Sequence, residues 1–328
     1  QLAGNAARDD RASSDRWLNL AIAQYDTLCT DEISSYYPDA RFNRALAHQS
    51  LATDSAMAFA DAEYRAILAD DDGYAERALV QIGELYFDRG RYDQAAQTSL
   101  QLLDSYPNSE HVDKAFMRLA LSRQAVGDLD RATSAFLGVP DTSLLYARAR
   151  LGGGHSLLSE RRYTDAVRVL EAGLPRADDD GQRASFNYLL GQAFGGEGDF
   201  SAAVARFSTA LQYSVEGELE EALRFSRGNA AFAVGTYRLA EEDFNWIVEY
   251  VREPRRVRSA KDALALVYLK QNRGNEAVRT LADMAADTDR PEERAIILNR
   301  LMDLHYEEDN HAETIVVARQ LIDLAFDD

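Results

Sequence analysis

Gly90-Arg91-Tyr92-Asp93-Gln94-Ala95 is the stretch that decides the fold, because close variants of it return along the chain at a nearly constant spacing. Three further copies are 161–166 (RRYTDA), 198–203 (GDFSAA) and 235–240 (GTYRLA). The alanines that align with the end of the motif are separated by 37, 34, 37, 37 and 37 residues: Ala95, Ala132, Ala166, Ala203, Ala240 and Ala277. With fainter copies through Ala60 and Thr314, the sequence predicts eight units, which begin near residues 41, 76, 113, 147, 184, 221, 258 and 295.

Small and bulky residues keep fixed places within these units. Twelve positions before the aligned alanine stand Gly83, Ala120, Gly154, Gly191, Gly228 and Ala265, and four positions after it stand Phe136, Leu170, Phe207, Phe244 and Leu281. Two helices approach closely only where a side chain is almost absent, so the pattern predicts one helix pair per unit that crosses at the small residue. The residues between the paired helices tolerate the left-handed conformation that ends a helix: Gly90, Gly127, Gly198, Gly235 and Asn272.

The order of a small residue, an aromatic residue, an alanine and a phenylalanine, with Pro107 closing one copy, resembles the tetratricopeptide repeat family. The resemblance covers residues 41–328. It implies an all-α fold, a right-handed superhelical solenoid of about eight tetratricopeptide-type helix pairs, because one pair cannot bury its apolar faces alone. Residues 1–40 fit the register poorly, and 11–29 has the pattern of a helix. We interpret 1–40 as an N-terminal helical cap or degenerate repeat and 41–328 as the repeat array.

The composition favours a folded helical chain with an acidic surface. Hydrophobic residues make up 46%, only six prolines occur, and no apolar stretch approaches the roughly 18 residues that cross a bilayer. The formal charge of -19 argues against nucleic acid and against anionic lipid as partners, since both require clustered cations. Lys114, Lys261 and Lys270 are the only lysines. The acidity is consistent with a salt-adapted source or with a basic partner.

No motif in the chain predicts catalysis, a cofactor or a metal. The glycine-rich stretches 152–154 and 195–198 lack the pattern of a phosphate-binding loop, and their repeat register predicts close packing and turns. The runs Asp70-Asp71-Asp72-Gly73 and Asp178-Asp179-Asp180-Gly181 lack the ligand spacing of a calcium loop and are typical of solvated helix starts. We interpret the acidic cluster between His305 and His311 as solvated surface, because it lacks the spacing of a zinc helix. The chain is therefore predicted not to be an enzyme.

The family resemblance implies a binding groove, because the first helix of each unit lines the concave face in related proteins. The groove positions carried over to this sequence are Phe87, Met117, Leu121, Leu158, Tyr188, Phe225, Asn229 and Phe232, with Glu84, Asp88, Arg148 and His155 among them. Half-exposed aromatic side chains on a rigid wall are good anchors for a partner. The alternative is that these side chains only fill the narrow inner side of the array.

The sequence thus favours a scaffold or adaptor that binds a peptide or a partner protein in its concave groove. The segment Leu102-Leu103-Asp104-Ser105-Tyr106-Pro107-Asn108-Ser109 resembles bacterial envelope members of the family, which suggests an envelope assembly and a periplasmic or envelope-associated location, with the cytoplasm as the other option. An alternative function is a periplasmic component of an exopolysaccharide or outer-membrane export machine. Self-association through uncapped ends is a further hypothesis, because no additional polar helix follows the last unit.

Overall fold

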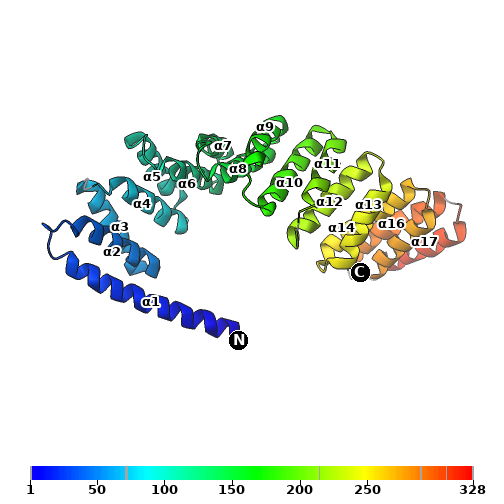
Figure 1. Cartoon of the computed structure of the whole chain (residues 1–328). Helices are drawn as coiled ribbons and strands as arrows, with labels where there is room; N and C mark the ends of the chain where they lie inside the picture. The colour runs from blue at the N-terminus through cyan, green and yellow to red at the C-terminus, as the bar shows by residue number, and fades with distance from the viewer. Residues whose placement is uncertain (1, 71–72, 214, 289, 308, 327–328) are drawn as a thin grey trace. The chain divides into compact units, whose positions relative to one another are not determined.

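The computed structural model describes residues 2–70, 73–213, 215–288, 290–307 and 309–326, and it is built from helices throughout these ranges (Figure 1). No strand occurs in them. Eight pairs of helices follow the N-terminal helix α1 (Leu2–Leu28): α2 (Tyr37–Leu51) and α3 (Asp54–Asp70), α4 (Ala75–Asp88) and α5 (Tyr92–Ser105), α6 (Val112–Ala125) and α7 (Leu129–Gly138), α8 (Tyr146–Ser159) and α9 (Tyr163–Gly173), α10 (Asp180–Glu197) and α11 (Phe200–Ala210), α12 (Glu218–Ala233) and α13 (Tyr237–Tyr250), α14 (Pro254–Lys270) and α15 (Gly274–Ala286), α16 (Pro291–Glu307) and α17 (His311–Phe326). A short 3₁₀ helix, η1 (Leu174–Arg176), follows α9. The all-α fold and the eight helix pairs predicted from the repeat spacing are confirmed.

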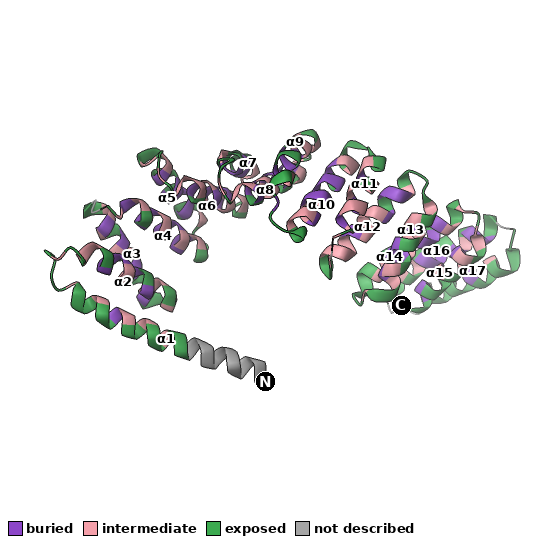
Figure 2. Ribbon diagram, viewed as in Figure 1, coloured by how far each residue is buried: buried purple, intermediate pink, exposed green. Residues whose placement is uncertain are grey.

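The chain divides into two compact units, Gln1–Glu160 and Arg161–Asp328. The first contains α1, three complete pairs and α8, and the second contains α9 and four complete pairs. Within each unit every helix packs on the helix that follows it, and buried residues gather where neighbouring helices face one another (Figure 2). The core is therefore continuous from pair to pair inside a unit, as expected for stacked repeats.

The first helices of successive pairs also contact one another directly. In the first unit α2 contacts α4 and α4 contacts α6, and in the second unit α10 contacts α12 and α12 contacts α14. Curvature of a stack shortens its inner side, so the helices that touch across repeats are those that line the inner face. This places the first helices on one face of each unit, which is the face that the sequence assigned to the groove.

The crossing of paired helices at small residues is confirmed where a glycine meets a phenylalanine. A Cβ atom added to Gly191 of α10 would lie 2.4 Å from the ring of Phe207 in α11, and one added to Gly228 of α12 would lie 2.8 Å from Phe244 in α13. Both rings are buried. At Gly83, by contrast, the nearest atom would be Cγ of Arg118 at 3.8 Å, so this crossing is open.

Left-handed residues stand between the paired helices, as predicted. The φ angles are 70° at Gly90, 85° at Gly198 and 58° at Asn272. In the fourth repeat the same position is occupied by Arg161, which is exposed and also left-handed, with φ at 58°. A side chain with a Cβ atom is strained in this conformation, so the fourth repeat closes its turn at a cost that the glycine repeats avoid.

Replacing this arginine should stabilise the protein. We expect Arg161→Gly to raise the free energy of unfolding by about 0.5–1 kcal/mol, because relief of the left-handed strain exceeds the extra backbone entropy of glycine in the unfolded chain. Urea unfolding followed by circular dichroism measures the change. The converse substitution, Gly198→Ala, should destabilise by about 1 kcal/mol. A destabilised Arg161→Gly variant would contradict the argument.

A buried ion pair joins α12 to α13. The Asp243 carboxylate is fully buried, and Arg227 donates to it twice, from Nε at 2.8 Å and from Nη2 at 2.7 Å. Nη1 of Arg224 lies 3.6 Å from the same carboxylate. Burial raises the pKa of Asp243 above its ordinary value, against the two arginines, which lower it.

The N-terminal region begins with a longer helix than predicted. The helix expected at 11–29 runs from Leu2 to Leu28, and the first repeat helix begins at Tyr37, four residues before the predicted start of the array. An ion pair of 3.2 Å joins Asp26 of α1 to Arg44 of α2, so the end of α1 is fixed to the first repeat. The division of 1–40 from the array stays a prediction.

Two of the acidic segments can be placed. Asp179 caps α10, accepting a hydrogen bond of 2.7 Å from the backbone nitrogen of Gln182, which confirms the predicted helix start. In the other run Asp70 ends α3, while residues 71 and 72 lie outside the described residues. The assignment of His305 to solvated surface is wrong: it is buried in the last turn of α16, a helix that packs on α15 and on α17. His311 is exposed as expected, and Glu308 lies outside the described residues.

Candidate functional site

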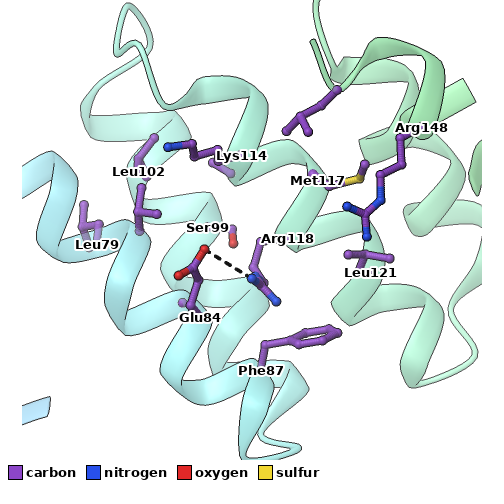
Figure 3. A pocket seen from close by; sticks show the side chains of 14 residues that line it. Leu79, Glu84, Phe87, Ser99, Leu102, Lys114, Met117, Arg118, Leu121 and Arg148 are labelled. Atoms are coloured by element: carbon purple, nitrogen blue, oxygen red, sulfur yellow. Dashed lines mark ion pairs between the residues drawn. The ribbon is translucent and has the colours of Figure 1, made fainter. Parts of the chain in front are cut away.

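A pocket of about 370 Å³ opens on the first helices of the second and third pairs. Its apolar lining includes three of the predicted groove residues: Phe87 from α4, and Met117 and Leu121 from α6 (Figure 3). Leu79 and Leu102 also line it. We call it the α4–α6 pocket. It is the place where the structure brings sequence-predicted groove residues together.

The pocket exists because one repeat lacks its bulky residue. Ser99 of α5 occupies the position at which Phe207 and Phe244 fill the helix crossing in later repeats. Opposite it stands Gly83 of α4, whose Cβ position would lie 3.9 Å from Oγ of Ser99. Two small residues therefore face each other where the fifth and sixth repeats pair a glycine with a ring. The volume that a phenylalanine ring would fill is left as a hollow, and Gly83 and Ser99 both line it.

Three cations and one carboxylate surround the apolar lining. Arg118 forms an ion pair of 3.5 Å with Glu84, and its guanidinium lies 4.5 Å from the centre of the Phe87 ring. This cation–π contact and the ion pair fix Arg118 in place. Lys114 and Arg148 are exposed, and neither has an ion-pair partner in the part of the chain that the structure describes. The pocket thus carries a local excess of two positive charges.

The remaining predicted groove residues lie apart from this pocket. Phe225 lines a second pocket of about 430 Å³ on α12, α13 and α14, where Glu221 and Arg256 form an ion pair of 2.7 Å. Tyr188 packs against the Phe207 ring at a centroid distance of 6.0 Å, and Phe232 packs against Tyr237 at 5.7 Å. The two rings therefore also serve the packing of their own helix pairs. Outside both pockets lie Leu158, which is half-buried, and Asp88, His155 and Asn229, which are exposed.

Sequence reasoning named Glu84 and Arg148 as groove residues but missed Lys114, Arg118 and Ser99. On α6, Lys114 lies three residues before Met117, and Arg118 lies three residues before Leu121. Residues three apart are neighbours on the surface of a helix, so both cations lie beside predicted groove residues. The signal for Ser99 was its departure from the bulky residues at its repeat position. A missing ring in one copy is visible in the alignment, but the hollow that results depends on Gly83 lying opposite.

The structure offers little that would support metal or thiol chemistry. Among the described residues no group of three or more His, Cys, Asp or Glu side chains could hold a metal ion. Burial raises the pKa of the half-buried Cys29 thiol, which keeps it protonated and weakly nucleophilic at neutral pH. The glycine-rich stretches pack as predicted: Cβ atoms at Gly152 and Gly196 would lie 2.6 Å and 2.4 Å from the rings of Phe136 and Tyr163. No described helix is long and apolar enough to cross a membrane.

One family model and several solved structures are similar to this chain. The family model that describes the tetratricopeptide repeat matches residues 77–109, which span α4 and α5. The C-terminal part of a TPR repeat-containing protein from Cytophaga hutchinsonii has a TM-score of 0.57 at 13% identity, and the match covers 75% of this chain and 95% of that chain. A tetratricopeptide repeat protein from Parabacteroides merdae has a TM-score of 0.49 at 11% identity, covering 80% of this chain and 98% of that one. PilF from Pseudomonas aeruginosa has a TM-score of 0.48 at 17% identity, with 65% and 91% covered. No curated protein sequence matches the chain.

The match of one repeat and the fold shared with a solved array agree with each other. Residues 77–109 match the tetratricopeptide repeat, and the helix pairs of this chain have the fold of a tetratricopeptide-repeat array. Such a fold is a scaffold for protein–protein interaction, and this is the general kind of function that the fold supports for this chain.

Proposed function

We propose that this protein is a scaffold or adaptor that holds a peptide, or a segment of a partner protein, against its first helices, with the α4–α6 pocket as the main anchor point. The observation that carries the proposal is the pocket itself, which combines an apolar lining with exposed cations on the face lined by the first helices. A hollow of about 370 Å³ suits one or two side chains of a bound segment.

The lining of the pocket supports an anchoring role. Phe87 and Leu121 are half-buried, so each has apolar surface left to cover, and both stand on helices held by their neighbours on either side. Rigid, partly exposed anchors lose little conformational entropy when a partner covers them. A bound side chain in this pocket would complete the packing that the absence of a ring at Ser99 leaves unfinished.

We further propose that the scaffold works in a bacterial envelope assembly, in the periplasm or attached to the envelope. The support is the local resemblance of residues 102–109 to envelope members of the family. Fractionation of the native cells, with the protein detected by antibody, tests the location. Recovery in the cytoplasmic fraction alone would contradict it.

The binding proposal is tested with a variant that trims the pocket. Leu121→Ala removes one apolar anchor from the α4–α6 pocket. We expect the tagged wild-type chain to capture a defined set of proteins from an envelope lysate of its source, and this variant to lose at least one of them. Quantitative mass spectrometry of the captured proteins is the measurement, with circular dichroism to show that the variant is folded.

The matched control is Leu100→Ala, which trims an exposed leucine on α5, a second helix outside the pocket. It should capture the same proteins as the wild type. If Leu121→Ala and Leu100→Ala both capture the full wild-type set, the α4–α6 pocket does not hold the partner.

A further inference from the structure

We propose that the occupant of the α4–α6 pocket is an acidic, extended peptide segment in which an aliphatic side chain is flanked by carboxylates. The inference rests on the proposed function and names the chemistry of its partner. It follows from the arrangement of Lys114, Arg118 and Arg148 around an apolar hollow. The aliphatic side chain would fill the hollow, and the carboxylates would meet the cations at its edge.

The local charge of the pocket is opposite to that of the chain. The whole protein has a formal charge of -19, but the pocket lining contains three cations and only one carboxylate, Glu84. Charges farther away than the Debye length of about 8 Å at physiological ionic strength are largely screened, so the nearby cations decide what the pocket attracts. One of the three lysines of the chain, Lys114, is placed here.

One of the three cations has partners within the pocket, and the other two have no ion-pair partner among the described residues. Arg118 is held by Glu84 and by the face of the Phe87 ring. Figure 3 shows Lys114 and Arg148 at different ends of the pocket, with Arg118 between Glu84 and Phe87. Two separated cations without ion-pair partners among the described residues suit two carboxylates of one extended segment better than a single anion.

The second pocket is a weaker candidate for the same chemistry. It contains Glu218 and Glu221 as well as Arg255 and Arg256, so its charges balance, and Arg256 is already paired with Glu221. An acidic peptide gains no net attraction there. This difference makes the α4–α6 pocket the specific site.

The test uses two fluorescein-labelled probes of the same length and spacing. The acidic probe is the capped peptide Asp-Glu-Leu-Glu-Asp, and the neutral probe is the capped peptide Asn-Gln-Leu-Gln-Asn. Fluorescence anisotropy with the full chain should give an affinity for the acidic probe about tenfold higher than for the neutral one. Equal binding of the two probes, or no binding of the acidic one, would overturn the proposal.

Three variants locate the binding. Lys114→Glu and Arg148→Glu reverse exposed charges in the pocket and should each weaken binding of the acidic probe by about tenfold. Ser99→Phe restores the ring found opposite Gly191 and Gly228, so it should close the pocket and abolish binding of the acidic probe while raising the thermal unfolding midpoint. A loss of binding in a stabilised variant does not come from unfolding.

The matched control is Arg91→Glu, which makes the same change in net charge at an exposed position before α5 and outside the pocket. It should leave binding unchanged, and weakening equal to that of Arg148→Glu would show a bulk charge effect and overturn the proposal. Concentration-dependent dimerisation that Arg148→Glu abolishes would overturn it as well, because the occupant would then be a second copy of the chain. If Leu121→Ala loses its captured protein and the charge reversals do not, the scaffold function stands and only the acidic chemistry fails.

Discussion

Arg227→Met should lower the free energy of unfolding by about 3 kcal/mol, the largest effect that we expect from a single substitution in this chain. The substitution removes both hydrogen bonds that Arg227 donates to the fully buried Asp243 carboxylate, and Arg224 at 3.6 Å compensates only in part. A buried carboxylate without its partner keeps its desolvation cost and loses the attraction that offset it. Urea unfolding, with hydrogen exchange of the α12 and α13 amides, measures the loss.

The loss should depend on pH with a defined sign. Burial already raises the pKa of Asp243 above its ordinary value of 3.8, and removing Arg227 raises it further. A carboxyl with a raised folded-state pKa makes the protein less stable as the pH rises through that pKa. The destabilisation by Arg227→Met should therefore be smaller at about pH 5 than at about pH 8.

Arg238→Met is the control, because Arg238 is almost fully exposed and pairs with Glu242 at the surface. It should change stability by less than about 1 kcal/mol at either pH. A loss from Arg227→Met that does not vary with pH would contradict the assignment of a buried, unpaired carboxylate.

The repeat register could be predicted from the sequence because some repeat positions favour a small set of residues. Glycine recurs at the position of Gly90 and Gly198, where the chain must turn through left-handed φ. Glycine also recurs at the position of Gly191, where a ring leaves no room for Cβ. Each such residue constrains its own repeat locally, so an alignment of copies is enough to find it. The all-α fold and the eight helix pairs followed from this.

The functional details could not be predicted in the same way because they depend on partners from other elements. Asp243 is one of many aspartates, and nothing in the sequence around it shows that Arg227 of the preceding helix covers it. Among the groove residues, Phe87, Met117 and Leu121 meet in one pocket while Tyr188 and Phe232 pack within their own helix pairs. The sequence assigned all five residues to one face. Whether a pocket forms on that face depends on whether a ring or a small residue such as Ser99 fills the helix crossing beneath it.

Gly191→Ala should lower the free energy of unfolding by about 2 kcal/mol, because the added Cβ atom would lie 2.4 Å from the Phe207 ring. This ring is buried and rigid, so it cannot move aside without separating α10 from α11. The gain in helix propensity from alanine, about 1 kcal/mol, offsets only part of the strain. The urea midpoint, followed by circular dichroism, measures the change.

Gly83→Ala is the matched control, since Gly83 holds the same repeat position and faces Ser99 instead of a ring. Its added Cβ atom would meet its neighbours at 3.8–3.9 Å, which is ordinary contact, so the gain in helix propensity should raise stability by about 0.5–1 kcal/mol. The two substitutions are chemically identical and should change stability in opposite directions. If Gly83→Ala destabilised the protein as much as Gly191→Ala, the second repeat would be closed at its crossing, and the α4–α6 pocket would have no structural origin in the absence of a ring at Ser99.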